Sequence, residues 1–318
     1  MARPLRIEYP GAFYHVTARG NEQKEIFKSQ RDREKFLSYL ESATERYGAV
    51  FHVYCLMSNH FHLLLETPQG NLSQIMQHIN SSYTTYYNVK RKRAGHLLQG
   101  RFKAILVEAD CYAAELSRYM HLNPVRANIV ETPEDYPWSS YRYYAGAATA
   151  GAVPPWLCTD FILEGFGKKA AVAQNNYRLF VYEMLSREYA SPMQETVAST
   201  ILGSAAFVSE IQEDHLNARK TDRDLPALRE LKERPSLDEI VKVVGEVFAD
   251  DERQARKVRI YLCHRFSGAR LREIGEMFSL TESGVTRASK RLAEAMEGDR
   301  ALRKKIANLQ NRLCLSIA

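Results

Sequence analysis

Residues 57–66 have the sequence MSNHFHLLLE, and this short stretch decides how the rest of the chain is interpreted. Successive side chains of a strand point to opposite faces of a sheet, so His60 and His62 would project together while Phe61 and the leucines face a core. Two imidazoles at this spacing form half of a metal site. The pattern therefore predicts a strand over 60–66 that carries two metal ligands.

Strand and helix patterns alternate on both sides of this stretch. The sequence predicts strands over 13–19, 50–57, 60–66 and 101–107, and helices over 31–47, 72–89 and 110–122. Gly20 and Gly48 would end the first strand and helix, Asp110 would cap the third helix, and Pro124 would end it. This order predicts an α+β domain with an antiparallel or mixed sheet of the split βαβ, ferredoxin-like kind, and covering helices against one face.

The rest of the chain predicts a helical region. A stretch rich in small residues, 146–155, is expected to be a linker, and the chain after it to be helical throughout. Helical patterns cover 178–185, 197–216, 237–248 and 253–266, whereas 220–235 is charged and expected to be exposed. We predict three parts: an α+β domain over 1–145, a linker and helical connecting region over 146–235, and a helical domain over 236–318.

Composition excludes several classes of protein. The chain has 318 residues of which 45% are hydrophobic, enough for packed cores. It contains no apolar run of about 18 residues and no signal-peptide pattern, so we expect a cytoplasmic protein that does not bind membranes. Its five cysteines are scattered without metal-binding spacing, and we interpret them as reduced thiols.

The distribution of charge suggests an anionic partner. Net charge is only +6, but residues 88–103 contain six basic residues and no acidic one, and residues 255–292 contain nine basic residues against three acidic ones. Either run, taken alone, is more commonly a solvated helix face. Two such runs near a possible phosphoryl-transfer site favour nucleic acid as the partner, and with it a nucleoid-associated location.

A second half of the site is expected near residue 120. Tyr119 and Asn123 are spaced to share a helix face, and Asn123 offers a carbonyl oxygen as third ligand beside His60 and His62. Such a nitrogen-and-oxygen set suits Mg²⁺ or Mn²⁺ better than a sulfur-rich zinc site. Tyr119 would then attack a phosphate, although a free phenol ionises only near about pH 10 and needs activation. The product would be a 5′-phosphotyrosine bond and a free 3′-hydroxyl.

Each of these features has a plainer explanation. A His-x-His strand is commonly incidental, asparagine before proline is a common helix end, and the chain has 18 tyrosines. Tyr83, Tyr86 and Tyr87 on the preceding helix are rivals for the role of nucleophile. No single residue distinguishes the functional interpretation from the plainer ones, and only the joint pattern does so.

Several linked motifs resemble the HUH single-tyrosine transposases, and most closely the REP-associated tyrosine transposases of bacteria. The resemblance covers about residues 1–145 and is carried by the segments 14–21 (YHVTARGN), 60–62 (HFH), 95–102 (GHLLQGRF), 119–127 (YMHLNPVRA) and 136–141 (YPWSSY). It implies that His60, His62 and Asn123 bind the metal and that Tyr119 cleaves single-stranded DNA beside a hairpin. It implies an intact site but leaves both a monomer and a homodimer open.

Basic side chains would then hold the DNA backbone of single-stranded and hairpin substrates. The candidates for this role are Arg19, Lys90, Arg91, Lys92, Arg93, His96, Arg101 and Lys103. The aromatic rings of Tyr86, Tyr87, His96 and Phe102 could stack on unpaired bases.

The C-terminal part predicts a second DNA-binding module. Residues 271–278 and 281–292 form two amphipathic helices joined by a turn, with Thr281 as N-cap, in a helix-turn-helix pattern. The apolar residues Leu271, Ile274, Phe278, Leu280, Val285, Ala288 and Leu292 would form its core. Five polar residues would face DNA: Glu282, Ser283, Thr286, Arg287 and Lys290. Residues 255–292 also resemble the DNA-binding domain of bacterial replication initiators, although a plain helical hairpin has the same periodicity.

Three hypotheses follow for the function. The first is a metal-dependent transposase that cleaves and rejoins single-stranded DNA at repeated palindromic elements. The second is a domesticated, non-catalytic, sequence-specific DNA-binding regulator that uses only the basic loop and the C-terminal helices. The third, hydrolysis by activated water, is disfavoured because no carboxylate base stands beside the histidines in the sequence.

Overall fold

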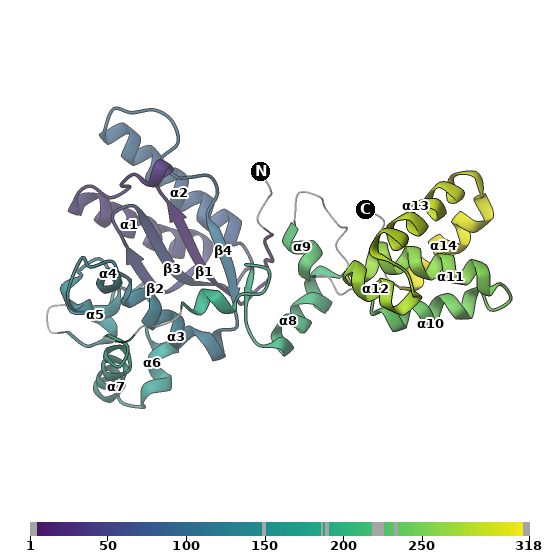
Figure 1. Cartoon of the computed structure of the whole chain (residues 1–318). Helices are drawn as coiled ribbons and strands as arrows, with labels where there is room; N and C mark the ends of the chain where they lie inside the picture. The colour runs from purple at the N-terminus through teal and green to yellow at the C-terminus, as the bar shows by residue number, and fades with distance from the viewer. Residues whose placement is uncertain are drawn as a thin grey trace. The chain divides into compact units, whose positions relative to one another are not determined.

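The computed structural model describes residues 5–147, 151–185, 187, 191–217, 226–231 and 235–313. The chain divides into two compact units, which we call the N-terminal unit (Pro4–Ile211) and the C-terminal unit (from Gln212 onward). Figure 1 shows the strands in the first unit and a purely helical second unit. The domain bounds proposed from the sequence, at 145 and 235, remain predictions, since compact packing units need not coincide with domains.

A five-stranded mixed sheet forms the centre of the N-terminal unit. Its strands are β1 (Ala12–Arg19), β2 (Val50–Leu56), β3 (His60–Thr67), β4 (Lys103–Val107) and β5 (Ile201–Leu202). Their order is β2-β3-β1-β4-β5, with β5 parallel to β4 and all other neighbours antiparallel. Strand β3 lies between β1 and β2, which is the split βαβ arrangement that the sequence predicts. The predicted fold class is therefore confirmed.

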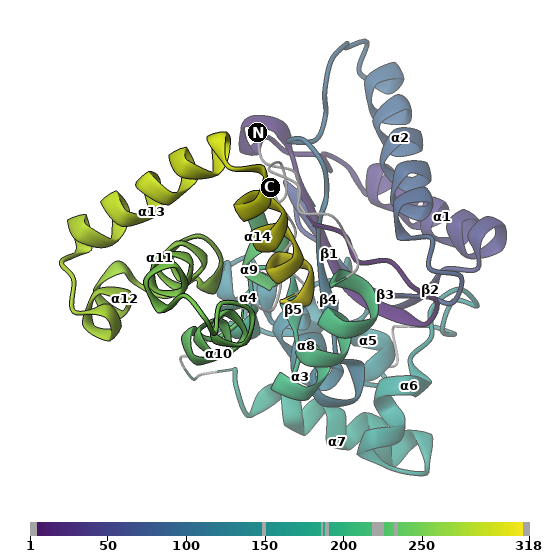
Figure 2. The same ribbon diagram turned by 90° about the vertical axis from the view of Figure 1, so that its right-hand side faces the viewer.

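Helices cover both faces of this sheet, because β3 is apolar on both sides. The Phe61 ring lies 4.7 Å from the Phe36 ring of α1, whereas Leu64, on the opposite face, packs in a core cluster with Leu116 of α3. Figures 1 and 2 show these two layers of helices. The expectation of helices against one face only was wrong. The helices of this unit are α1 (Gln30–Tyr47), α2 (Leu72–Lys90), α3 (Ala109–His121), α4 (Asn123–Arg126), α5 (Tyr141–Tyr144), α6 (Asp160–Leu163), α7 (Ala170–Tyr182) and α8 (Ala205–Ile211).

The ends of these helices test the predicted stop signals. Gly48 ends α1 in a left-handed conformation (φ 64°), and its N–H donates to the Thr44 carbonyl, as expected for a glycine stop. The predicted cap at Asp110 was wrong, because α3 begins at Ala109 and Asp110 lies inside its first turn. Helix α3 ends at His121, and Pro124 lies in the first turn of α4, where its missing N–H costs no hydrogen bond.

The chain after residue 145 packs onto the same unit. Trp156 is buried against Phe51 and Tyr54 of β2, and Tyr177 of α7 is buried against α3. Residues 148–150 of the predicted linker lie outside the described residues. The expectation of a helical chain after 155 was wrong at residues 201–202, where β5 pairs with the free edge of β4.

The C-terminal unit is helical, as the sequence predicts. Its helices are α9 (Pro226–Leu231), α10 (Leu237–Val247), α11 (Glu252–Leu262), α12 (Leu271–Phe278), α13 (Glu282–Gly298) and α14 (Arg300–Arg312). The last five of these helices pack around one core. Most of the predicted exposed segment 220–235 lies outside the described residues, but Leu228 and Leu231 of α9 are buried. Cys55, Cys111, Cys158 and Cys263 are free thiols, and Cys314 is outside the described part. None of the described helices is long and apolar enough to cross a bilayer.

A tight turn joins α12 to α13. Ser279 adopts a left-handed conformation (φ 54°), and the Oγ1 of Thr281 accepts the Gly284 N–H at 3.1 Å as the predicted N-cap. A Cβ atom at Gly275 would lie 2.5 Å from the Leu280 carbonyl oxygen, so only glycine allows this close approach. All seven predicted core residues of the two helices are buried or partly buried in one cluster.

Candidate active site

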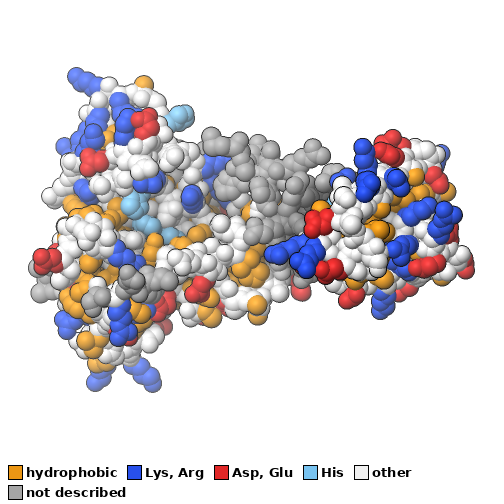
Figure 3. Space-filling model, in the orientation of Figure 1, with side chains coloured by type: hydrophobic (Ala, Val, Ile, Leu, Met, Phe, Trp, Pro, Cys, Tyr) orange, Lys and Arg blue, Asp and Glu red, His pale blue; other side chains and the backbone are white. Residues whose placement is uncertain are grey.

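The two histidines of the opening motif lie on one face at the beginning of β3. His60 is opposite Arg19 and His62 is opposite Thr17 in the antiparallel pairing of β3 with β1. Their ring centroids are 5.0 Å apart. Figure 3 shows histidine side chains gathered at the surface of the N-terminal unit, with basic and apolar side chains around them. The strand alternation that the sequence predicts therefore holds for this pair.

Helix α3 brings Tyr119 to the same face of the sheet. The Tyr119 ring lies 6.3 Å from the His62 ring at an interplanar angle of 82°. The rivals Tyr83 and Tyr87 belong to α2 on the other face, where both rings are buried and donate hydrogen bonds to the carbonyl oxygens of Ile26 and Glu25. Of these tyrosines, only Tyr119 stands beside the histidines.

Asn123 has the chemistry of a third ligand. It is the first residue of α4, four positions after Tyr119, and its Nδ2 atom is buried with no hydrogen-bond partner among the described residues. Rotating the terminal amide by 180° exchanges nitrogen for oxygen at that position, because the two atoms are assigned from their partners. An unpartnered amide that can present its oxygen fits a metal site of two nitrogens and one oxygen.

A metal bound by His60 and His62 would need a third ligand that is not a carboxylate, a thiol or another imidazole. Within the described ranges, no group of three or more His, Cys, Asp or Glu side chains is arranged to hold a metal ion. The set of His60, His62 and Asn123 fits a hard divalent cation by donor chemistry, and it remains a prediction.

Burial keeps both imidazoles neutral. It lowers the pKa of His62 well below the usual value, helped by the neighbouring rings of His15 and His60. Burial also lowers the pKa of His60, and the positive charge of Arg19 adds to the effect. A neutral imidazole has a free nitrogen lone pair, which is the form that binds a metal.

Positive charge surrounds the histidines and the tyrosine. The Arg126 guanidinium lies 5.2 Å from the centroid of the Tyr119 ring. Arg19 is directly opposite His60, and Lys103 of β4 is opposite Thr17, which is itself opposite His62. These cations can attract a phosphodiester to the face that carries Tyr119.

The second half of the predicted basic segment returns to this end of the sheet. The Gln99 N–H donates to the Arg19 carbonyl at 2.8 Å, and the Asn21 N–H donates to the Leu97 carbonyl at 2.9 Å. The loop is thereby tied to the end of β1, next to His60. Five predicted DNA-binding side chains of this segment are exposed: Lys92, Arg93, His96, Arg101 and Lys103.

Lys90 and Arg91 have a different environment. Both pair with Asp32, whose side chain is buried at the start of α1, and the Lys90 Nζ lies 2.8 Å from its Oδ1. Burial alone would raise the pKa of Asp32, but the hydrogen bonds from Arg91 and Lys90 outweigh it and hold the pKa far below its usual range. Their role in DNA binding stays a prediction, and the structure shows that they neutralise a buried carboxylate.

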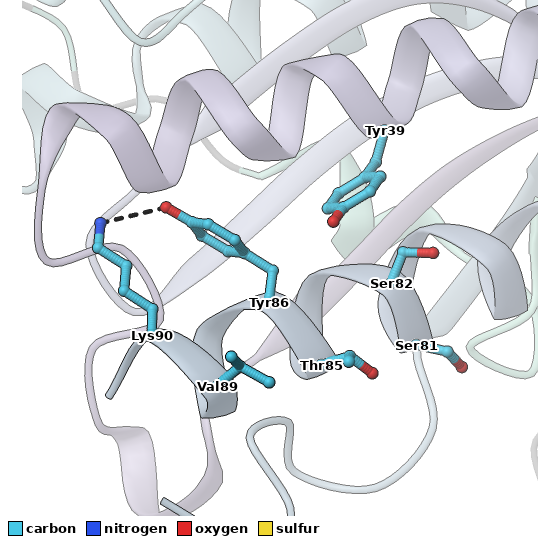
Figure 4. Close-up of a pocket in the computed structure, with 7 residues that line it drawn as sticks. All are labelled: Tyr39, Ser81, Ser82, Thr85, Tyr86, Val89 and Lys90. Atoms are coloured by element: carbon cyan, nitrogen blue, oxygen red, sulfur yellow. Dashed lines mark hydrogen bonds between the residues drawn. The ribbon is translucent and has the colours of Figure 1, made fainter. Parts of the chain in front are cut away.

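Lys90 also lines a cavity between α1 and α2. Figure 4 shows its amine directed toward the Tyr86 hydroxyl, at 3.1 Å, with Tyr39 across the cavity. The lining residues are Tyr39, Ser81, Ser82, Thr85, Tyr86, Val89 and Lys90. Tyr87 and Phe102 are buried, and the guanidinium groups of Arg91 and Arg6 lie over their rings, so the proposal that these two rings stack on bases was wrong.

The predicted DNA-facing residues of the C-terminal unit lie on one helix. Glu282, Ser283, Thr286, Arg287 and Lys290 of α13 are all exposed, while Val285 and Leu292 between and beyond them are buried. The helical period therefore separates a polar outer face from the core as predicted. Their contact with DNA stays a prediction.

Sequence reasoning missed three residues of this site, two beside the histidines and one beside Tyr119. His15 Nε2 lies 3.0 Å from His62 Nδ1, Asn59 Oδ1 lies 2.7 Å from His60 Nδ1, and Arg126 covers Tyr119. Strand alternation places His15 on the face that also carries Thr17 and Arg19, which is a usable signal. The pairing of β1 with β3, which brings His15 to His62, was not visible in the sequence.

The sheet thus carries a histidine pair on one strand, with a tyrosine from a covering helix beside it. Residues 9–123 match the family model described as "Transposase IS200 like". A REP-associated tyrosine transposase of Haemophilus influenzae is 25% identical over 119 residues, which cover 34% of this chain and 68% of that protein. A solved structure of a REP-associated tyrosine transposase bound to a REP hairpin aligns with a TM-score of 0.41 and 16% identity, over 51% of this chain and 93% of the other.

Proposed function

We propose that this protein is a transposase that cleaves and rejoins single-stranded DNA beside palindromic hairpins, through a covalent bond between Tyr119 and DNA. The match of residues 9–123 to the IS200-like transposase model supports DNA cleavage in general. The similarity to REP-associated transposases supports repeated hairpin elements as the substrate class. The observation that carries the proposal is the approach of the Tyr119 ring to within 6.3 Å of the His62 ring.

The chemistry follows from the side chains on this face. The phenolic oxygen of Tyr119 attacks phosphorus, the bond to the 3′ oxygen breaks, and the products are a 5′-phosphotyrosine and a 3′-hydroxyl. Attack by a 3′-hydroxyl on the same phosphorus reverses the step and rejoins DNA. Arg126, over the Tyr119 ring, and Arg19, opposite His60, would hold the phosphate beside the nucleophile.

We propose His60, His62 and Asn123 as the ligands of Mg²⁺ or Mn²⁺. When bound, such an ion would polarise the phosphate and stabilise negative charge during the displacement. Activation of water is the less favoured alternative. Throughout the part of the chain that the structure describes, no carboxylate is hydrogen-bonded or ion-paired to either histidine.

The C-terminal unit would add affinity for duplex or hairpin DNA. Its support is the exposed polar face of α13 and the basic character of residues 255–292, which carry nine basic against three acidic residues. A helix that presents Ser283, Thr286 and Arg287 outward has the side chains that contact phosphates and base edges.

The test is formation of a covalent adduct. Labelled single-stranded oligonucleotides that contain palindromic repeats are incubated with the full chain and Mg²⁺ or Mn²⁺. We expect a protein–DNA adduct that survives denaturing electrophoresis and leaves a free 3′-hydroxyl. Tyr119→Phe should abolish the adduct while DNA binding persists, and Tyr112→Phe, two turns earlier on α3, should retain it.

Two results would contradict the proposal. Cleavage that persists in Tyr119→Phe would assign the chemistry to activated water. Tight, chelator-insensitive binding without any adduct on repeat-derived DNA would instead favour the non-catalytic regulator.

A further inference from the structure

Each histidine of the proposed metal site uses one ring nitrogen inside the protein. His60 Nδ1 lies 2.7 Å from Asn59 Oδ1, and His62 Nδ1 lies 3.0 Å from His15 Nε2. No hydrogen bond is formed by either Nε2 atom within the described residues. Both rings are therefore held through Nδ1, and in both the Nε2 atom is the one without a hydrogen bond to a described residue.

Asn59 determines the proton position on His60. Its Nδ2 donates to the Gln23 carbonyl at 3.1 Å, and a carbonyl can only accept, so the orientation of the amide is defined. Asn59 Oδ1 must then accept a proton from His60 Nδ1. In a neutral imidazole this leaves the Nε2 atom unprotonated, with a lone pair available for a metal.

His15 holds His62 in a related way. The two rings are nearly parallel, with an interplanar angle of 7° and centroids 5.2 Å apart, and His15 is only 3% exposed. One of the two facing nitrogens must carry the proton. If His62 Nδ1 donates, its Nε2 can bind a metal; if His15 Nε2 donates, His62 carries its proton on Nε2 and cannot.

The second nitrogen of the His15 ring explains why both proton positions are possible. His15 Nδ1 is buried and has no hydrogen-bond partner among the described residues. A bound cation would select the arrangement in which His62 donates, because only that arrangement frees His62 Nε2. His15 can accept this proton with no movement of its ring, since it already faces His62.

We propose that Asn59 and His15 are positioning residues that hold His60 and His62 with their unprotonated Nε2 atoms directed to a divalent cation. This inference rests on the metal site of the proposed function. Outer hydrogen bonds of this kind orient a ligating histidine, and their loss typically weakens metal binding by about 10–100-fold. Neither residue is expected to touch the metal or the DNA.

The first test measures Mn²⁺ binding to the full chain by calorimetry, without DNA. Asn59→Ala and His15→Leu should each weaken binding by about 10–100-fold. His15→Gln should restore most of it, because its amide oxygen can accept the His62 proton. The matched control is His52→Leu, which removes another buried histidine of the sheet, stacked on Phe13, and should bind Mn²⁺ as the wild type does.

A second readout reports the protons directly. In protein with ¹⁵N-labelled histidine and Mg²⁺, the ring nitrogens of His60 should show a protonated Nδ1 and an unprotonated Nε2. Asn59→Ala should give His60 a mixture of both tautomers while the thermal midpoint shows that the fold persists. A general loss of packing would not change the tautomer of one ring.

The outcomes separate this inference from the proposed function. Wild-type protein that binds no Mn²⁺ would overturn the metal site and this inference with it, whereas an adduct formed through Tyr119 would still stand. Wild-type binding that is unchanged in both Asn59→Ala and His15→Leu would overturn this inference alone. If His15→Leu does not fold, His15→Gln and the His60 tautomer decide the matter.

Discussion

The two units of this protein build their candidate functional surfaces in opposite ways. In the N-terminal unit, His15, His62 and Tyr119 come from β1, β3 and α3, and they meet only because β3 pairs with β1 and α3 covers that face. In the C-terminal unit, Glu282 to Lys290 lie on one helix, and a single helical period exposes them. The first surface is partly buried and depends on the whole fold, and the second is exposed and local. Substitutions should therefore affect chemistry in one unit and affinity in the other.

The largest effect should come from the histidine pair. His60→Ala removes a proposed ligand and should lower the rate of nicking by about 10³-fold or more, since metal ligation supplies much of the charge stabilisation. Binding of duplex DNA should change by less than about twofold, if the C-terminal unit supplies it. The measurement is adduct formation and duplex affinity on the same preparation. An equal loss of adduct formation and duplex affinity would contradict this difference between the two units.

Acid should destabilise the N-terminal unit more than the C-terminal one. Burial lowers the pKa of His52 to about 4 and that of His121 to about 3, so the folded unit stays neutral at both positions while the unfolded chain takes up protons below about pH 6.5. The contribution of each histidine to the free energy of unfolding is fully present above about pH 6.5 and is lost as the pH falls toward the folded-state pKa. We expect a loss of about 1–2 kcal/mol for each histidine between pH 7 and pH 5.

Both tryptophans, Trp138 and Trp156, lie in the N-terminal unit, so their fluorescence in urea reports its unfolding alone. His52→Phe should reduce this pH dependence. A pH dependence of equal size in His52→Phe and the wild type would contradict the assignment.

The turn between α12 and α13 should tolerate no side chain at Gly275. Gly275→Ala places a Cβ 2.5 Å from the Leu280 carbonyl oxygen and should destabilise the C-terminal unit by about 1–3 kcal/mol. Gly298→Ala is the matched control, because a Cβ there meets no atom within 4 Å. Helix content against temperature should show the loss, while tryptophan fluorescence should not change. An equal effect of the two substitutions would refute the close approach.

The smallest effect should come from the exposed face of α13. Arg287→Ala removes one proposed phosphate contact and should weaken DNA binding severalfold, with the slope of log affinity against log salt reduced by about 0.9. Thermal stability should be nearly unchanged, since Arg287 is exposed and, among the described residues, forms hydrogen bonds only to Ser283 of its own helix. An unchanged salt slope would place the DNA elsewhere.

Sequence patterns located most elements of both units, because apolar period and stop signals are local. The helix ended by Gly48, the strand around His60 and the N-cap at Thr281 all lie where these patterns predict them. The errors have physical causes. Asp110 has the right chemistry for a cap, yet the helix starts one residue earlier, and β5 forms only because β4 offers an unpaired edge.

The sequence by itself determined the chemical groups of this protein: a histidine pair at strand spacing, a tyrosine and an asparagine four residues apart, and a helix with one polar face. Only the tertiary structure decided which groups meet. It assigned Lys90 and Arg91 to the buried carboxylate of Asp32, and it placed His15 behind His62. The physical reason is that side-chain direction follows from local backbone geometry, whereas strand pairing and helix packing depend on contacts between distant residues.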